Sequence, residues 1–230
     1  MSDSRVLLVF AKTPTPGKVK TRLLPAVSPE AAAALHKACS VDTLQLARKM
    51  RGCDVLVFTA GGTSYFRTLA RKQGSGARLR ILPQRGADLG ARMENAFRKS
   101  FAMGYREAVV IGTDTPWMGM NRLRRAFAGL QRNDVVIGPA QDGGYYLLGM
   151  RKLVPEIFRR IPWSTGRVLQ LTLKKILALK LRSKLLRRDF DLDRPGDLKR
   201  AAKMLKKRPR LAPVLSSELA RIHRRRKSIG

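Results

Sequence analysis

Cationic side chains cluster directly after the first apolar run of the chain. The run VLLVFA (6–11) is followed by KTPTPGKVKTRL, which supplies Lys12, Lys20, Thr21 and Arg22. Arginine binds phosphate oxygens bidentately, whereas lysine supplies a mobile point charge. The segment contains neither the P-loop pattern GxxxxGK[ST] nor the dinucleotide-binding pattern GxGxxG, in which a glycine-rich backbone approaches the phosphates. Side chains would therefore provide much of the positive charge. The spacing predicts a polyphosphate-binding loop; a solvated basic turn is the alternative.

Two later segments carry carboxylates that suit a divalent cation. Asp114 directly follows the apolar run in VVIGTDTPW, and FDLDRPGDL contains Asp191 and Asp193. Carboxylate oxygens are hard ligands of the kind that Mg²⁺ and Mn²⁺ prefer. Asp191 and Asp193 lie along an expected strand, and we expect one of them to face the ligand and the other to point away. A helix cap or a turn is the alternative role for Asp114.

The segment GPAQDGGYYLLGM (138–150) combines an acid, two glycines and a tyrosine. Asp142 is a candidate base, or binding group, for an acceptor. Gly143 and Gly144 allow the backbone to approach a ligand closely. Tyr145 can stack on a ring. A hairpin turn with Asp-Gly chemistry is the alternative.

Strands that alternate with helices must position these groups. The hydrophobic pattern predicts a mostly parallel sheet built from βαβ units. The expected strands are 5–11, 54–59, 78–82, 107–112 and 134–138, and the expected helices are 28–50, 63–73, 89–103 and 120–130. After residue 140 we expect an aromatic strand, a helix capped by Ser164 or Thr165, an edge strand at 183–193, a helix from 195 and a weak helix at 216–226. Ligands bind beyond the carboxyl ends of parallel strands, so the segments that follow the strands should rim one crevice.

Length and composition limit the class of protein. A chain of 230 residues suits one α/β domain. It contains no apolar run of about 18 residues, so we expect no transmembrane helix. The two cysteines lack metal-ligand spacing and fit a cytoplasmic protein. His36 and His223 lack a catalytic context and are interpreted as surface or packing residues.

The charge is strongly basic and uneven. Lysine and arginine number 48 against 16 acidic residues, and residues 151–230 hold 25 of the basic but 6 of the acidic ones. Such a field attracts polyanions, although a general basic bias is the simpler explanation. One reading is therefore a basic nucleic-acid-binding module that uses the tail and residues 174–188. Aromatic residues for base stacking are scarce there.

Taken in order, these motifs resemble a bacterial GT-A-like family of uncharacterised transferases associated with radical SAM or selenium-domain genes. The matching segments are FAKTPTPGKVKTRLLP, DLGARMENAF, IGTDTPWM, GPAQDGGYYLLG, IPWST and DLDRPGDL, which together span residues 6–198. The opening is also similar to that of 2-phospholactate guanylyltransferases. PQRGADLG resembles the base-binding segment of sugar-phosphate nucleotidyltransferases.

The resemblance implies a role for each matching residue. Asp114 and Asp193 would hold Mg²⁺ or Mn²⁺, and Gln84 and Gly90 would lie near the base. Phosphate would be bound by Lys12, Lys20, Thr21 and Arg22, and the acceptor by Asp142, Gly143, Gly144 and Tyr145; the catalytic residues would be Asp142, Arg22 and Lys20. DLDRPGDL is similar to the closing motif of sugar-phosphate nucleotidyltransferases. At residues 194–196 it has Arg-Pro-Gly in place of the more common Thr-Pro-Glu, but it keeps Asp193.

We therefore expect one GT-A-type α/β domain (1–207), with a mixed, mainly parallel sheet between two helical layers, and a basic extension (208–230). The expected function is a metal-dependent transferase that uses a nucleotide-sugar donor and a small-molecule acceptor. The alternative enzyme is a nucleotidyltransferase that couples an NTP to a phosphorylated acceptor and releases pyrophosphate. The cation-rich opening loop favours the alternative, whereas the family resemblance and the DGGYY turn favour the nucleotide-sugar.

Overall fold

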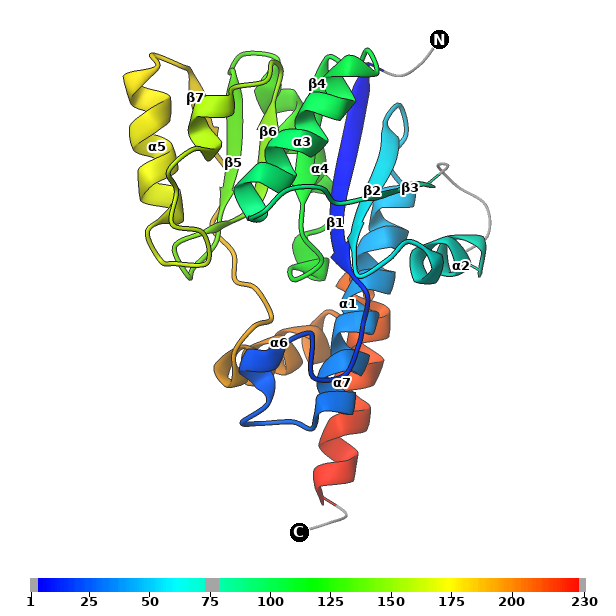
Figure 1. Cartoon of the computed structure of the whole chain (residues 1–230). Helices are drawn as coiled ribbons and strands as arrows, with labels where there is room; N and C mark the ends of the chain where they lie inside the picture. Colours follow the sequence, from blue (N-terminus) through cyan, green and yellow to red (C-terminus); the bar gives the residue numbers. More distant parts are fainter. Residues whose placement is uncertain (1–3, 73–78, 228–230) are drawn as a thin grey trace.

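Seven strands form a single sheet in the computed structural model, which describes residues 4–72 and 79–227 (Figure 1). The strand order is β3-β2-β1-β4-β6-β5-β7; β6 runs antiparallel to β4 and β5, and the other neighbouring pairs are parallel. The strands are β1 (Arg5–Lys12), β2 (Asp54–Ala60), β3 (Leu79–Pro83), β4 (Glu107–Ile111), β5 (Val135–Pro139), β6 (Tyr145–Met150) and β7 (Ser183–Leu185). The predicted mixed, mainly parallel sheet is confirmed.

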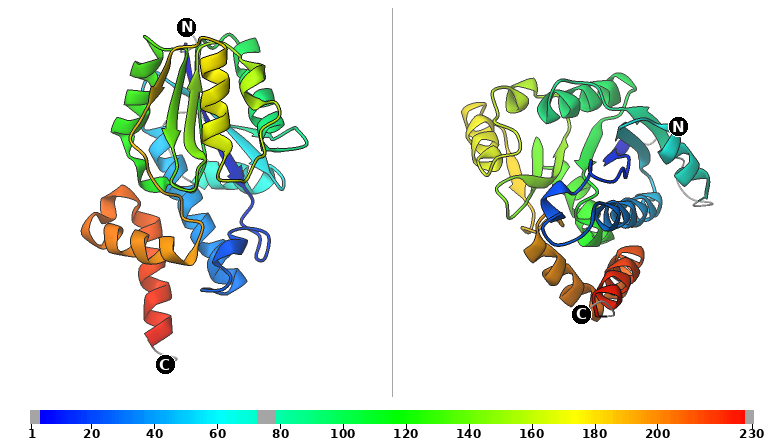
Figure 2. Two further views of the ribbon diagram at one scale, coloured as in Figure 1. Left: turned by 90° about the vertical axis from the view of Figure 1, so that its left-hand side faces the viewer. Right: turned by 60° about the horizontal axis from the view of Figure 1, so that its bottom comes forward.

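Helices cover both faces of this sheet and give three layers (Figure 2). One apolar cluster joins one sheet face to α1, α2 and α4, and a second joins the other face to α3, α5 and the short η3. The described helices are α1 (Pro29–Arg48), α2 (Ser64–Lys72), α3 (Leu89–Ala102), α4 (Met120–Leu130), α5 (Val168–Ala178), α6 (Pro195–Lys207) and α7 (Pro213–Lys227), with short turns η1 (Thr21–Leu23), η2 (Pro116–Met118), η3 (Pro155–Phe158) and η4 (Pro209–Leu211).

A third apolar cluster lies beyond the sheet, where α6 and α7 pack against the first half of α1 (Figure 1). Leu35 on α1 and Leu215 on α7 are fully buried there. The Asp42 carboxylate accepts hydrogen bonds from the backbone N–H groups of Val214 and Leu215, at the start of α7. This contact satisfies N–H groups that a helix start leaves unpaired. The division into a domain (1–207) and an extension (208–230) stays a prediction.

The expected elements appear with ends within two residues of the predicted ones up to residue 139. The predicted helix end at residue 73 and strand start at residue 78 lie outside the described residues. Two later expectations are wrong. Neither Ser164 nor Thr165 caps α5, which begins at Val168 after Arg167 and has no side-chain cap. The edge strand ends at Leu185, and from there only Asp189 forms a bridge, to Ala140. No helix of the described residues is long and apolar enough to cross a membrane.

Candidate functional site

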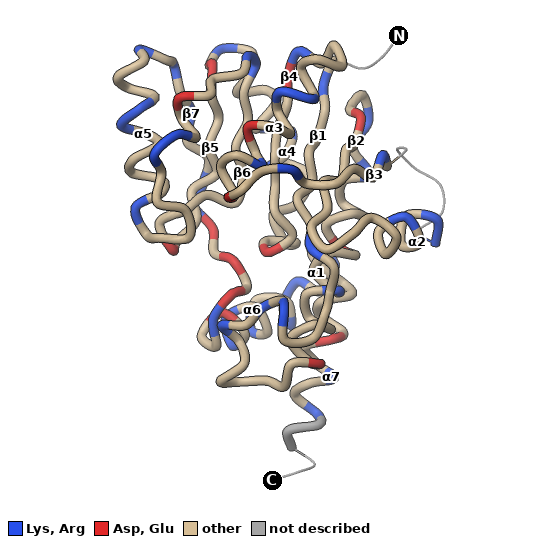
Figure 3. Tube along the Cα trace, in the orientation of Figure 1, with Lys and Arg blue, Asp and Glu red and all other residues tan. Residues whose placement is uncertain are grey.

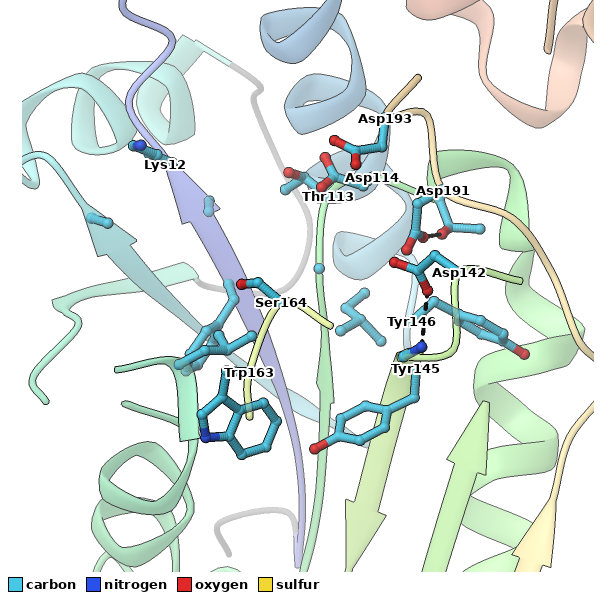
Figure 4. Close-up of a pocket in the computed structure, with 18 of the residues that line it drawn as sticks. Lys12, Thr113, Asp114, Asp142, Tyr145, Tyr146, Trp163, Ser164, Asp191 and Asp193 are labelled. Carbon is cyan, nitrogen blue, oxygen red and sulfur yellow. Dashed lines mark hydrogen bonds between the residues drawn. The ribbon is translucent and has the colours of Figure 1, made fainter. Parts of the chain in front are cut away.

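A pocket of about 530 Å³ lies beyond the carboxyl ends of β1, β2, β3, β4 and β5. Each segment expected to rim a crevice contributes to it. The predicted site residues that line it are Lys12, Lys20, Thr21, Arg22, Gln84, Asp114, Asp142, Gly144, Tyr145 and Asp193. Gly90 and Gly143 lie behind this lining. Figure 4 shows Asp114, Asp142, Asp191 and Asp193 grouped together, apart from the rings of Tyr145 and Trp163.

The opening loop folds back on itself at the end of β1. The Lys12 ammonium donates to the carbonyl of Lys18 (2.7 Å), and the Thr13 hydroxyl donates to the carbonyl of Gly61 (2.9 Å). Gly17 turns the chain with a φ of 73°, a conformation that glycine adopts without a steric cost. These contacts hold the loop over the sheet edge and leave Arg22 half-exposed at the pocket.

Lys20 is buried beneath the loop, with a side chain that is 2% exposed. Its Nζ lies 2.6 Å from Oδ1 of Asp114 and also donates to the carbonyl of Leu192. Its φ of 49° is uncommon for a residue with a side chain, and these buried contacts hold it there. Burial lowers the pKa of Lys20, but Asp114, with smaller contributions from Cys39 and Asp191, raises it, and the net pKa lies above its usual value. Lys20 is thus a fixed cation beneath Asp114 rather than a mobile one.

Asp114 lies between two basic groups at the end of β4. Burial opposes ionisation, but Lys20 and then His36 lower the pKa of the Asp114 carboxyl below its usual value. The His36 Nε2 atom lies 2.9 Å from the carbonyl of Lys12, so this nitrogen carries the proton, and Nδ1 faces Asp114 at 4.0 Å. Burial lowers the pKa of His36. Asp114 is therefore held as a carboxylate, with 45% of its side chain exposed.

Arg22 and Asp193 face each other across the pocket rim. The Arg22 Nη1 atom lies 2.8 Å from Oδ2 of Asp193, and both side chains remain partly exposed. Asp197 accepts hydrogen bonds from the backbone N–H groups of Asp193 and Arg194 and so fixes the start of α6. A residue predicted to bind phosphate and one predicted to bind metal are therefore adjacent.

Asp191 also lines the pocket, so the prediction that Asp191 and Asp193 point to opposite sides is wrong. Side chains two residues apart share one face of a strand, so even a regular strand would have placed both on one side. Residues 190–194 in fact form no strand, and the Leu192 N–H donates to the Asp114 carbonyl at the end of β4. The Thr115 hydroxyl donates to Asp191. Burial, and then the neighbouring Asp114, raise the pKa of Asp191 to about 7.

This raised pKa predicts how Asp191→Asn changes stability in metal-free protein. An unfolded aspartate ionises near pH 3.9, so the folded wild type loses stability as the pH rises from about 4 to about 7. The asparagine carries no charge and still accepts from Thr115. We expect Asp191→Asn to be more stable than the wild type at pH 8 and equal to it near pH 4. Urea unfolding in EDTA at both pH values measures this, and an unchanged pH slope would contradict it.

Asp142 and the two glycines form a tight turn between β5 and β6. The Asp142 Oδ1 atom accepts a hydrogen bond from the N–H of Gly144 (2.9 Å), and the side chain remains exposed toward the pocket. Gly143 has a φ of 89°, and a Cβ there would lie 2.0 Å from the carbonyl oxygen of Gly166. Gly143 thus lets the segment before α5 approach the turn.

Gly143→Ala is expected to destabilise the protein by about 2–4 kcal/mol, because a backbone clash is added to an unfavourable φ. Gly144→Ala is the matched control. A Cβ at Gly144 would meet only the Asp142 side chain, 3.3 Å away, and should cost less than about 1 kcal/mol. Chemical unfolding of both variants checks this, and equal losses would contradict it.

An aromatic wall faces the carboxylates across the pocket. The ring of Trp163 meets Tyr145 edge-on, with centroids 6.4 Å apart (Figure 4). A Cβ on Gly90 would lie 2.3 Å from Trp163 Nε1, so Gly90 makes room for this ring. The Gln84 amide nitrogen donates to the carbonyls of Ala11 and Phe58, which leaves its side-chain oxygen as an acceptor.

The acidic residues suit a hydrated divalent cation. Among the described residues, no three His, Cys, Asp or Glu side chains form a ready metal cage. Mg²⁺ is commonly held by one or two carboxylates together with phosphate and water. The contacts of Lys20 and Arg22 engage Oδ1 of Asp114 and Oδ2 of Asp193, so the second oxygen of each carboxylate is available. The donor set therefore fits Mg²⁺ or Mn²⁺.

The sequence predictions assign no ligand role to three pocket residues: His36, Asp191 and Trp163. The sequence indicates a surface or packing residue at position 36, and only the buried position of His36 beside the end of β1 relates it to Asp114. Asp191 lies two residues before Asp193, and because such residues share one face of a strand, the spacing itself is a signal for both. Trp163 belongs to the matching segment IPWST, but nothing in that segment assigns the tryptophan a role.

The architecture and pocket define a protein with the fold of nucleotide-diphospho-sugar transferases. The chain has a TM-score of 0.86 and 33% identity to a structure from Desulfovibrio desulfuricans G20 that is provisionally named a nucleotide-diphospho-sugar transferase, over 96% of this chain and 95% of that one. A 4-diphosphocytidyl-2C-methyl-D-erythritol synthase from Anaerococcus prevotii has a TM-score of 0.60 and 10% identity, over 89% and 98%. A cytidylyltransferase from Leptospira borgpetersenii has a TM-score of 0.54 and 13% identity, over 90% and 96%.

The amino-acid sequence also identifies the family of this chain. Residues 43–165 match the model of DUF2064, described as an uncharacterised protein conserved in bacteria. No curated protein matches the chain significantly. The chain therefore belongs to the DUF2064 family.

Proposed function

We propose that this protein is a metal-dependent transferase that uses a nucleotide-diphospho-sugar as its donor. The observation that carries the proposal is the pocket itself, where four aspartates lie on one side and an aromatic wall on the other (Figure 4). Arg22 lies beside one of these aspartates, Asp193. Its volume of about 530 Å³ falls within the range of small-ligand sites. The name of the relative from Desulfovibrio desulfuricans G20 agrees with this class of donor.

The residues divide into donor and acceptor groups. Asp114 and Asp193 would hold Mg²⁺ or Mn²⁺, which when bound neutralises the charge that develops on the leaving diphosphate. Arg22 and Lys12 would bind the phosphates, and Lys20 would hold Asp114 in place. Gln84 would accept a hydrogen bond from the base.

In the transfer step, an acceptor hydroxyl attacks the anomeric carbon of the sugar. The carbon–oxygen bond to the diphosphate breaks, and the nucleoside diphosphate leaves with the electron pair. Asp142 would take the acceptor proton, because its second carboxylate oxygen is not used by the turn and the side chain is open to the pocket. Tyr145 and Trp163 would bind the sugar by ring contact and exclude water.

Nucleotidyl transfer is the alternative, and the burial of Lys20 weakens the argument for it. An NTP brings three phosphates, so the cation-rich loop favoured this reaction. Lys20 is engaged by Asp114 and by the carbonyl of Leu192, so the loop presents fewer free cations than its sequence suggests. A two-phosphate donor agrees better with this arrangement.

Incubation of the purified protein with Mn²⁺ and panels of NTPs and nucleotide-sugars tests the proposal. Release of a nucleoside diphosphate from one nucleotide-sugar, lost in Asp142→Asn and in EDTA, is the expected result. Pyrophosphate release from an NTP that requires a phosphorylated acceptor would replace the proposal with nucleotidyl transfer.

A further inference from the structure

The edge of the molecule formed by α5 and β7 combines exposed leucines with lysines and arginines. Leu177 is 79% exposed, Leu179 40% and Leu185 50%. They are three of the five exposed large apolar residues in the described chain; Leu89 lies at the pocket and Leu211 near α7. Soluble proteins seldom gather large apolar side chains at an exposed site without an interaction to serve.

The same edge is strongly basic. Residues 168–188, which include α5 and β7, contain seven lysines and arginines and no acidic residue. Lys174, Lys180 and Lys184 are exposed there, and Figure 3 shows basic residues along α5 and around β7. Among the described contacts, Asp134 offsets this charge by pairing with Arg182.

The exposed leucines lie on the same side of the sheet. A Cβ on Gly129 of α4 would lie 3.1 Å from the side chain of Lys184 in β7, and Leu186, the residue after β7, packs into the cluster that includes α4. Leu185 alternates with these two residues, so it lies on the opposite face, which α5 covers. Leu177 and Leu179 lie at the end of α5. Figures 1 and 2 show α5 and β7 side by side at the edge far from β3.

We propose that this α5–β7 edge, defined by Leu177, Leu179, Leu185, Lys174, Lys180 and Lys184, binds the surface of an anionic phospholipid bilayer. Apolar side chains enter the boundary between headgroups and acyl chains, and surrounding lysines attract anionic headgroups. The protein would bind peripherally. None of the six residues lines the pocket, so binding would leave the pocket accessible.

Two other binding partners would use fewer of the residues that define this edge. Nucleic acid would use the positive charge but not the leucines, and residues 174–188 contain no aromatic side chain on which bases could stack. A second copy that paired through the open edge of β7 would place two positive surfaces together. Lysines on an edge strand oppose such pairing.

Flotation of the full-length protein with vesicles tests the proposal. We expect binding to phosphatidylcholine vesicles that contain one third phosphatidylglycerol, and none to phosphatidylcholine alone. Leu177→Gln/Leu179→Gln/Leu185→Gln keeps the charge and should weaken binding about tenfold. Lys174→Gln/Lys180→Gln/Lys184→Gln should weaken it about a hundredfold, from about 1 kcal/mol per lysine. Because all six side chains project from the surface, both variants should keep the wild-type circular dichroism spectrum.

Controls separate this edge from the general charge of the protein. Arg67→Gln/Arg71→Gln/Lys72→Gln removes three exposed charges from α2 at the opposite edge, and Leu211→Gln removes an exposed leucine elsewhere. Each should weaken vesicle binding less than about threefold. An equal loss in the α2 variant, or unchanged binding in the triple leucine variant, would overturn the proposal. So would binding to duplex DNA but not to vesicles, or a dimer in sedimentation velocity that the leucine changes abolish.

Discussion

Replacing Asp114 by asparagine is expected to abolish Mn²⁺-dependent nucleotide binding and to lower kcat/KM about a thousandfold, the effect of losing a metal ligand. The change should also destabilise the fold by about 2 kcal/mol, because it leaves the buried ammonium of Lys20 without its carboxylate. We expect a smaller loss of stability than for a fully buried ion pair, because the Asp114 side chain is 45% exposed.

The stability of Asp114→Asn should also depend on pH in a way that the wild type does not. Without Asp114, burial would dominate and lower the pKa of Lys20 below its unfolded value of about 10.4. The unfolded chain would then bind more protons, so the variant should gain stability as the pH rises from 7 to 10. Urea unfolding at both pH values measures this gain.

A double variant separates stability from chemistry. Lys20→Met/Asp114→Asn removes both charges, so it should recover most of the lost stability but none of the Mn²⁺-dependent binding. Asp189→Asn is the control, because it breaks the ion pair between Asp189 and Arg122 outside the pocket. It should lose stability and keep nucleotide binding. Nucleotide binding by Asp114→Asn within twofold of the wild type would exclude Asp114 as a metal ligand.

The sequence predicts the sheet well because local patterns determine it. Val6 to Ala11, for example, form an apolar run that must be covered on both faces, which indicates an internal strand. Strands and helices alternate up to β5, and parallel strands connected in this way have their carboxyl ends at the same edge of the sheet. The pocket therefore follows from topology, and so do Asp114 and Arg22 as residues at its rim.

The ionic contacts within the pocket could not be predicted in this way. The bond between Lys20 and the carbonyl of Leu192 joins residues 172 positions apart, and no local pattern sets such a contact. The path of residues 189–193 likewise depends on the backbone bonds from Asp189 to Pro139 and from Leu192 to Asp114. These tertiary contacts replace the strand that the sequence suggests for residues 186–193, and they fix Asp191 and Asp193 at the pocket.

The contrast between Lys20 and Arg22 changes the meaning of the opening loop. Both are cations in the same motif, yet Lys20 is buried against Asp114 and Arg22 is 49% exposed beside Asp193. Lys20 is thus suited to hold a carboxylate, and Arg22 is suited to bind phosphate. The loop then contributes one fixed and one accessible cation.

Arg22→Ala is accordingly expected to weaken nucleotide binding in Mn²⁺ by about 10- to 100-fold, because charged hydrogen bonds contribute about 1.5–3 kcal/mol. Arg22→Lys keeps the charge but loses the planar fork, so its affinity should be intermediate. Stability should change by less than about 1 kcal/mol, since an exposed ion pair contributes little.

Lys18→Ala is the matched control for Arg22→Ala, because Lys18 lines the same pocket from the same loop. Lys18→Ala should lower the affinity for the nucleotide by less than about threefold, because it removes only a share of the general charge of the loop. Isothermal titration of the variants with a nucleoside diphosphate and Mn²⁺ compares them directly. Equal losses in Arg22→Ala and Lys18→Ala would show that the loop acts only through its total charge. A selective loss in Arg22→Ala would identify the guanidinium as the phosphate ligand, because both changes remove one charge and only one removes the fork.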